Sequence, residues 1–484
     1  MRKLLDVSSQ RLISITEILL ENDGWTTFAN LGSAIGTSER TVAKDIAMLR
    51  ERWGHHLNIK VSKKNGVRLI NQNISSIGAV FKDIFNDSLS LQWIRELLFH
   101  PSMSMEFYES QLFTSRSTLL RILPKINLYL SGKGMKIICE NNRYDFIGDD
   151  EQYLRDFSAN FLLELYGFDL KKFDINLDLS ILRDIILSLL FENVDSNEFS
   201  WISNDEILVV YHMMFYIVSL VREQNGYTVT SKYYSDINIR PEHLSHIKNN
   251  FQDIRIQNLN PIHEYITNQF NGWTSDEEKI SVTDAISAFC DRFFSDVSFD
   301  PDHETIKNLN YILKNIYFNT KLRPFRTSEL FDRIYYFSLS LSRENPKLYE
   351  VTHNCLVLFS KKVGLDVSAR VSDVLFWMCL ICPELNDVKK HYRAALVSDF
   401  GNCHAGFLAE TISAFFNGRS TDFLTIDVLS FMDILTGKDL KSYDLLITTF
   451  PGISYAHEKS ILINDYPGTD DFCTIYKTLQ QRQL

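Results

Sequence analysis

The sequence predicts a multidomain, mainly α protein: two N-terminal winged helix-turn-helix units, two helical bundles and a small C-terminal α/β domain. Three observations support this fold class. A helix, a short helix, a capped helix and a β-hairpin follow one another twice near the N-terminus, amphipathic helices fill the middle, and strands alternate with helices at the end. A chain of 484 residues is too long for one core. We expect domains at 1–72, 73–162, 163–274, 275–390 and 391–484.

The first unit is predicted from local signals. Apolar residues at helical spacing between 9 and 22 indicate one helix, and Gly36 closes a second, short helix. Either Thr37 or Ser38 is placed to cap a third helix. The following stretch LNIKVSKKNGVRLI alternates around Lys-Asn-Gly, which is typical of a β-hairpin.

In a winged helix-turn-helix unit, the third helix enters the DNA major groove and the hairpin, or wing, contacts phosphate. The polar side chains of the third helix and the basic ones of the hairpin are therefore candidate DNA contacts. An ordinary solvated helix face is the alternative interpretation, and the basic hairpin favours DNA. The candidates in this unit are Ser38, Arg40, Thr41, Lys44, Lys63, Lys64 and Arg68.

The same order of elements recurs in the second unit. Helices are expected at 89–99, 103–113 and 114–134, and MKIICENNRYDFIG is expected to form the second hairpin. A proline inside a helix removes a hydrogen bond, so Pro124 is expected to end the groove-facing part near Leu123. Ser115 is the candidate cap, and the candidate DNA contacts are Arg116, Ser117, Arg121 and Lys125.

Charge is distributed unevenly along the chain. The formal net charge is -11, yet residues 1–70 hold 11 Lys and Arg against 7 Asp and Glu. Residues 110–143 hold 6 basic residues against 1 acidic residue. The N-terminal third can therefore face a polyanion although the whole chain is acidic.

The middle of the chain is predicted to be helical. Gly272-Trp273-Thr274 is the expected boundary between two bundles, and a small parallel α/β sheet is expected after residue 390. The predicted helices of the middle region are 177–194, 204–226, 251–270, 281–297, 303–319, 329–345, 347–364 and 371–383.

This order of parts, with the stretches SERTVAKDI and SRSTLLR, resembles the Mga/AtxA family of global virulence regulators of Gram-positive bacteria. The resemblance implies a DNA-binding transcriptional activator. It also implies two regulation domains phosphorylated on histidine by the phosphocarrier protein of the sugar phosphotransferase system. A IIB-like C-terminal domain and a homodimer formed through the C-terminal half are implied as well. Bent or A·T-rich promoter DNA is a candidate target, read through shape.

Two positions depart from the pattern of that family. His212 follows an acidic helix start, as a phosphorylated histidine of a regulation domain would, although a hydrogen-bonded core histidine is the alternative. The second bundle has Cys379 at the matching place, which leaves His303 or His353 as substitutes. In the C-terminal domain, Ser398 or Asp399 stands where a IIB domain has its phosphocysteine, and Cys403 comes later, so phosphotransfer by this chain is not expected.

Other function classes have little support. The pair Cys379 and Cys382 lacks the second pair that a zinc site needs, and no P-loop, nucleophile elbow or dinucleotide motif occurs. We therefore expect no enzyme, no cofactor and no metal. Scattered cysteines, no export signal and no apolar run of ~20 residues favour a cytoplasmic protein away from membranes. The alternatives are a phosphotransferase-system component or an RNA-binding antiterminator that uses the helix-turn-helix units for docking.

Overall fold

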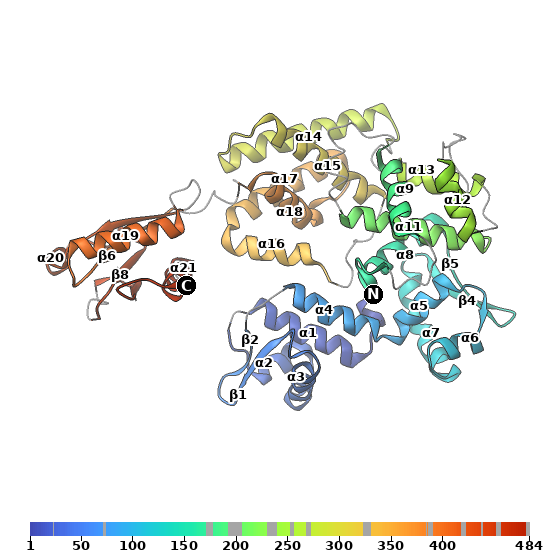
Figure 1. Ribbon diagram of the computed structural model, residues 1–484, viewed down its shortest axis with the longest axis horizontal. Helices are drawn as coiled ribbons and strands as arrows, with labels where there is room; N and C mark the ends of the chain where they lie inside the picture. The colour runs from blue at the N-terminus through green and yellow to red at the C-terminus, as the bar shows by residue number, and fades with distance from the viewer. Residues whose placement is uncertain are drawn as a thin grey trace. The chain divides into compact units, whose positions relative to one another are not determined.

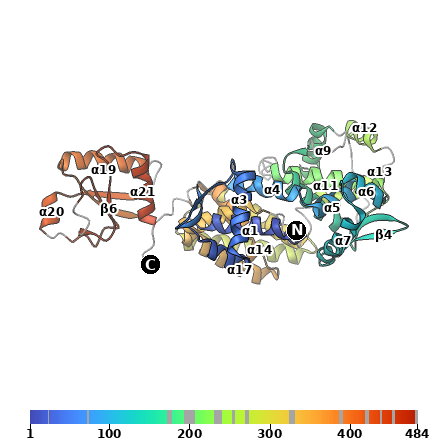
Figure 2. The ribbon, with the colours of Figure 1, turned by 90° about the horizontal axis from the view of Figure 1, so that it is seen from below.

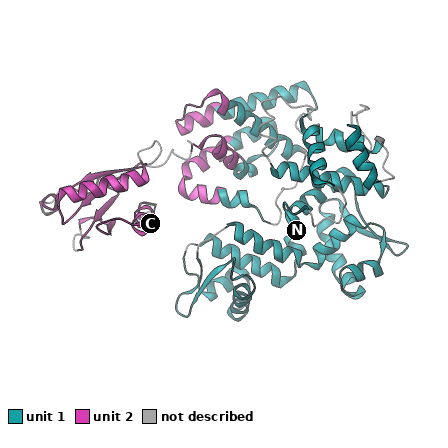
Figure 3. Ribbon diagram, viewed as in Figure 1, with its two compact units in different colours: residues 1–290, 306–337, 356–373 teal, residues 291–305, 338–355, 374–484 magenta. Residues whose placement is uncertain are grey.

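The fold was described from a computed structural model of the chain (Figure 1). The described residues are 1–22, 24–70, 74–170, 178–191, 206–229, 240–251, 256–267, 273–322, 331–383, 385, 391–417, 423–436, 439–451 and 456–480. No helix within these ranges combines the length and the apolar character that crossing a membrane requires. Clustering of contacts divides the chain into two compact units (Figure 3). The first comprises 1–290, 306–337 and 356–373, and the second comprises 291–305, 338–355 and 374–484.

The first winged helix-turn-helix has the predicted elements. A short 3₁₀ helix η1 precedes three helices and a hairpin, whose strands pair from Asn58 with Ile70 to Ser62 with Gly66. Thr26, just before the second helix, bridges Val67 of the hairpin and so adds a third, minimal strand. The elements are η1 (Arg2–Leu4), α1 (Val7–Glu21), α2 (Phe28–Ile35), α3 (Glu39–Trp53), β1 (Asn58–Ser62) and β2 (Gly66–Ile70).

The second winged helix-turn-helix is built in the same way. Its hairpin pairs from Met135 with Gly148 to Glu140 with Arg143, and it projects beyond α7 (Figure 2). Asn141 and Asn142 have φ of 52° and 60°, the left-handed pair that a two-residue hairpin turn requires. The elements are α4 (Ile74–Asn86), α5 (Leu89–Phe99), β3 (Met103–Ser104), α6 (Met105–Gln111), α7 (Arg116–Ser131), β4 (Met135–Glu140), β5 (Arg143–Gly148) and α8 (Glu151–Tyr166).

The two units repeat with a constant spacing. Thr26 and Met103, Ser38 and Ser115, and Val67 and Tyr144 are each separated by 77 residues. Met103 pairs with Tyr144 as Thr26 pairs with Val67, so the third strand is repeated as well. The β-hairpins differ in their turns and strand lengths: the first has a three-residue turn between five-residue strands, and the second a two-residue turn between six-residue strands.

The middle region is helical, as predicted. Helix α12 of this region is not among those that the sequence predicted, and neither are α4 and α8 of the second unit. Of the expected boundary Gly272-Trp273-Thr274, Gly272 lies outside the described residues. The helices are α9 (Leu179–Phe191), α11 (Glu206–Gln224), α12 (Pro241–Asn250), α13 (Ile256–Thr267), α14 (Asp276–Val297), α15 (His303–Leu322), α16 (Arg333–Glu344), α17 (Pro346–Val363), η3 (Ser368–Arg370) and α18 (Val371–Ile381).

The C-terminal region forms a four-stranded, fully parallel sheet in the order β7-β6-β8-β9. Apolar side chains of α19 and α21 pack with one set of strand residues, and Ile434 of α20 packs with the alternate set, so helices cover both faces. The parallel sheet confirms the α/β prediction. The elements are β6 (Tyr392–Val397), α19 (Asn402–Phe416), β7 (Leu424–Val428), α20 (Phe431–Leu435), β8 (Leu445–Thr448), β9 (Ser460–Leu462) and α21 (Thr469–Gln480).

Candidate nucleic-acid interface

Helix α3 begins at a serine cap. The Ser38 Oγ accepts a hydrogen bond from the Thr41 backbone N–H at 3.2 Å and lies 2.9 Å from the Thr41 Oγ1. This bond satisfies one of the four N–H groups that a helix leaves unpaired at its start. Of the two predicted caps, Ser38 is therefore the one used. The inner face of the helix carries Val42, Ile46, Leu49 and Trp53, all of them buried.

An ion pair between the half-buried Arg11 and the buried Asp45 holds α3 against α1. Asp45 is 2% exposed and accepts two hydrogen bonds from Arg11, with Nε–Oδ2 at 2.8 Å and Nη2–Oδ1 at 3.2 Å. The hydrogen bond to Asp45 raises the pKa of Arg11. Two parallel hydrogen bonds restrict the relative orientation of two groups more than a single bond does. The Arg11–Asp45 pair therefore holds α3 against α1 and also fixes the direction in which the outer face of α3 points.

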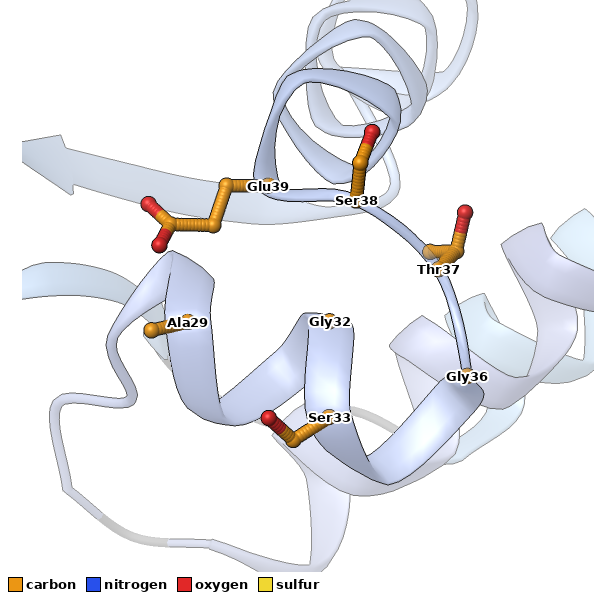
Figure 4. Close-up of a pocket in the computed structure, with 7 residues that line it drawn as sticks. All are labelled: Ala29, Gly32, Ser33, Gly36, Thr37, Ser38 and Glu39. Atoms are coloured by element: carbon orange, nitrogen blue, oxygen red, sulfur yellow. The ribbon is translucent and has the colours of Figure 1, made fainter.

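The turn between α2 and α3 passes very close to α2 (Figure 4). A Cβ on Gly32 would lie 2.7 Å from the Thr37 carbonyl oxygen, so only glycine fits. Gly36 ends α2 with φ of 74°, a left-handed value that glycine adopts easily. The turn borders an open hollow lined by Ala29, Gly32, Ser33, Gly36, Thr37, Ser38 and Glu39.

Helix α7 is the counterpart of α3. The Ser115 Oγ accepts from the Thr118 backbone N–H at 3.4 Å and lies 3.0 Å from the Thr118 Oγ1. Its inner face carries Leu119, Ile126 and Leu130, which are buried. The two helices therefore start with the same Ser-x-x-Thr cap and bury the same side.

The outer faces of both helices carry the predicted polar residues. Ser38, Arg40 and Lys44 are exposed on α3, and Thr41 is half-buried. Ser117 and Arg121 are exposed at the corresponding face of α7. Within the described part of the chain, Arg40, Lys44 and Arg121 form no ion pair, so their charges face solvent.

Arg116 has nearby acidic partners. Its Nη1 lies 3.7 Å from the Glu106 Oε1, and both side chains are more than half exposed. Its backbone N–H also donates to Glu109 of α6. An exposed ion pair of this length contributes little to stability.

The first wing carries the predicted basic residues. Lys63 and Lys64 are exposed in the turn, where the Ser62 Oγ accepts from the backbone N–H groups of Lys64 and Asn65. Arg68 is half-buried on β2 and faces Lys60 across the hairpin. Lys60 is not among the predicted contacts, although its place opposite Arg68 could have been found from the alternation of the strand.

Helix α7 continues past Pro124 to Ser131, within the predicted helix 114–134, and the end of its groove-facing part near Leu123 stays a prediction. Lys125 donates to the carbonyl oxygens of Leu4 and Leu5, with Nζ–O distances of 3.4 and 2.6 Å. Because the ammonium group holds the N-terminal segment in place, Lys125 is left out of the interface proposed below.

His212 lies in the interior of the helical middle region. The side chain is fully buried on α11, with its ring 4.9 Å from the ring of Tyr211. The second-bundle cysteines Cys379 and Cys382 are also buried. No cluster of three or more metal-ligating side chains was found within the described ranges.

In the C-terminal domain, a serine follows the end of strand β6. The buried Ser398 follows β6, and its Oγ lies 2.7 Å from the His404 Nδ1. The His404 Nε2 lies 2.8 Å from the Asp465 carbonyl oxygen. Cys403 is exposed on the first turn of α19, away from the position directly after the strand. The residue directly after the strand is therefore Ser398, and the absence of phosphotransfer by this chain stays a prediction.

The fold and the two exposed basic helix faces define a protein with tandem winged helix-turn-helix units. Residues 73–162 match the model of the Mga helix-turn-helix domain. The chain is 27% identical over 168 residues, 35% of its length, to a Streptococcus pneumoniae serotype 4 protein whose name describes a trans-acting regulator. It is 25% identical over 31% of its length to the capsule synthesis positive regulator AcpA of Bacillus anthracis. It is also 27% identical over 26% of its length to the anthrax toxin expression trans-acting positive regulator.

These matches confirm the resemblance to the Mga/AtxA family of regulators. The aligned segments cover 33%, 31% and 26% of those three relatives, so the chain matches about a third of the length of each. The relatives are named as regulators and not as enzymes, in agreement with the expectation for this chain.

Proposed function

We propose that this chain is a transcription regulator that binds duplex DNA through both winged helix-turn-helix units. The main support is the repeated construction of α3 and α7, which have the same cap, the same buried face and exposed basic side chains outside. A helix of this kind places its first residues at base edges in the major groove. The names of the relatives, two of them positive regulators, favour an activator.

A salt-titrated DNA-binding assay on the full chain tests this proposal. We expect the double variants Arg40→Ala/Lys44→Ala and Arg116→Ala/Arg121→Ala each to weaken binding about tenfold or more. Each should also reduce the slope of log affinity against log salt by up to about 2, because lost phosphate contacts release fewer counterions. The larger loss identifies the dominant unit.

A control variant with the same change in charge removes two exposed lysines elsewhere, Lys248 on α12 and Lys279 on α14. Lys248→Ala/Lys279→Ala should leave the affinity and the salt slope nearly unchanged. If this control weakens binding as much as the helix variants, the effect is one of total charge and the proposed interface is wrong. No duplex affinity in wild type at low salt would also refute the proposal.

We further propose that the helical region and the C-terminal region correspond to two regulation domains and a IIB-like domain. In this proposal a phosphocarrier protein phosphorylates His212. Since the imidazole is fully buried, α11 must move before the ring can react. Phosphoenolpyruvate-dependent labelling that is lost in His212→Ala tests this step. Labelling that survives in this variant would assign the phosphate to another residue.

We also propose that the chain forms a homodimer through its C-terminal half. Exposed apolar side chains on α19 and α20 support this, namely Phe415, Phe431 and Met432. Sedimentation of the full chain beside Phe415→Ser and Met432→Ser variants tests it. A monomeric wild type at working concentrations would contradict the proposed dimer.

A further inference from the structure

The turn before α7 contains an unusual residue. Phe113 stands two residues before the Ser115 cap, as Gly36 stands two residues before Ser38. Both have left-handed backbones, with φ of 48° for Phe113 and 74° for Gly36. In both turns, the backbone N–H of the following residue donates a hydrogen bond to the carbonyl oxygen five residues earlier. These bonds run from Thr37 to Gly32 and from Thr114 to Glu109. The two turns have equivalent backbones but very different side chains.

Nothing in the fold of the second unit explains this phenylalanine. A left-handed conformation is unfavourable for residues with a Cβ and is normally filled by glycine, as in the first unit. The Phe113 side chain is 97% exposed, so burial of the ring does not compensate for the strain. Strained residues that persist in a structure are concentrated at functional sites.

A second exposed apolar side chain lies on the helix that follows this turn. Leu120 is on the second turn of α7, 43% exposed, next to the exposed Arg121 and one turn beyond Arg116. The corresponding residue of α3, 77 positions earlier, is the small Ala43. The apolar pair is therefore a property of the second unit alone, and basic residues flank it.

We propose that Phe113 and Leu120 determine the specificity of the second unit by contacting thymine C5-methyl groups in the major groove. The inference rests on the proposed function, because α7 must enter the groove. Thymine alone presents a methyl group there, and apolar side chains are its natural partners. The flanking arginines attract a polyanion, so a DNA groove fits this surface better than an apolar protein does.

The experiment removes the thymine methyl group from the DNA and keeps the base pair. The full chain is titrated with an A·T-rich duplex, selected from a random pool by wild type, and with the same duplex carrying deoxyuridine for thymidine. Wild type should lose about fourfold in affinity per methyl group that is removed from a buried contact. Phe113→Gly and Leu120→Ala should bind the thymine duplex more weakly and discriminate less between the two duplexes.

Two further measurements separate the possible outcomes. Phe113→Gly should unfold at the same temperature as wild type or higher, because the strain is relieved, so weaker binding cannot come from misfolding. Leu128→Ala removes a leucine that is 79% exposed near the end of α7, and it should leave the discrimination unchanged.

Equal affinity of wild type for both duplexes overturns the inference while leaving the proposed function intact. Discrimination that persists in both variants overturns it as well. A wild type that binds neither duplex refutes the proposed function, and the inference with it.

Discussion

Arg222 of α11 donates a hydrogen bond to the Phe146 carbonyl oxygen on β5, with an Nη1–O distance of 2.9 Å. Its Nε also donates to the Glu151 Oε1 at 2.8 Å, and its guanidinium lies 3.7 Å from the ring centre of Tyr227. The Tyr227 hydroxyl in turn donates to Asp145 at 2.7 Å. The helix that carries His212 is thus joined by a direct hydrogen bond to a strand of the second wing.

This connection predicts that Arg222→Met destabilises the protein and weakens DNA binding by the second unit. Arg222 is fully buried, and its loss leaves the Glu151 carboxylate with Arg155 as its remaining charged partner, so we expect a cost of roughly 1.5 to 3 kcal/mol. Chemical denaturation of the full chain measures the loss of stability. Arg183→Met, which breaks an exposed ion pair with Glu206, is the control and should cost less than about 1 kcal/mol.

Gly32→Ala should disrupt the first helix-turn-helix. The new Cβ would lie 2.7 Å from the backbone oxygen of Thr37, so the turn must shift by several tenths of an ångström. We expect a loss of roughly 1 to 3 kcal/mol and weaker DNA binding by the first unit. Gly24→Ala is the matched control, since its Cβ would meet no atom within 4 Å. Equal effects of the two substitutions would show that the close approach is unimportant.

Asp45→Asn should loosen α3 from α1. Arg11 would keep a neutral partner in place of a carboxylate, and hydrogen bonds between charged groups are worth about 1.5 to 3 kcal/mol. Hydrogen exchange of the α1 and α3 amides is expected to accelerate, and binding by the first unit should fall because the outer face is less well oriented. Glu39→Gln, an exposed change on the same helix, should not accelerate this exchange.

The sequence predicted the parts of the fold that depend on local signals. Capping serines, the Lys-Asn-Gly turn and apolar periodicity lie within a few residues of one another, and the structure confirms the elements they predicted. The orientation of Lys125 toward the carbonyls of Leu4 and Leu5 depends on a contact across 120 residues, which no local pattern contains.

The candidate site was predictable in its charges and not in its apolar residues. Arg40, Lys44 and Arg121 were predicted as contacts because basic residues on a capped helix suggest phosphate binding, and they are exposed in the structure. Phe113 was missed because its backbone angle and exposure are known only from the structure. Aligning the sequences of the two units at a spacing of 77 residues matches Phe113 with Gly36. This match is the signal that could have identified Phe113 as unusual.

The first turn of α14 should make the helical region sensitive to acid through Glu278. Burial alone would raise the pKa of Glu278, but hydrogen bonds from Lys321, Thr274 and Tyr317 outweigh it and lower the pKa to about 2. The ionised carboxylate is therefore stabilised by folding. This contribution is complete above the unfolded pKa, near 4.5, and is lost as the pH falls through about 2.

Hydrogen exchange of the α14 and α15 amides, measured between about pH 6 and pH 3 and corrected for intrinsic rates, tests this expectation. Wild type should lose protection on acidification, by on the order of 2 kcal/mol. Glu278→Gln should be less protected at neutral pH and should change less with pH, because Lys321 has lost its charged partner. Glu277→Gln alters an exposed neighbour and should behave as wild type does. If Glu278→Gln retains the full acid sensitivity, the titrating group lies elsewhere.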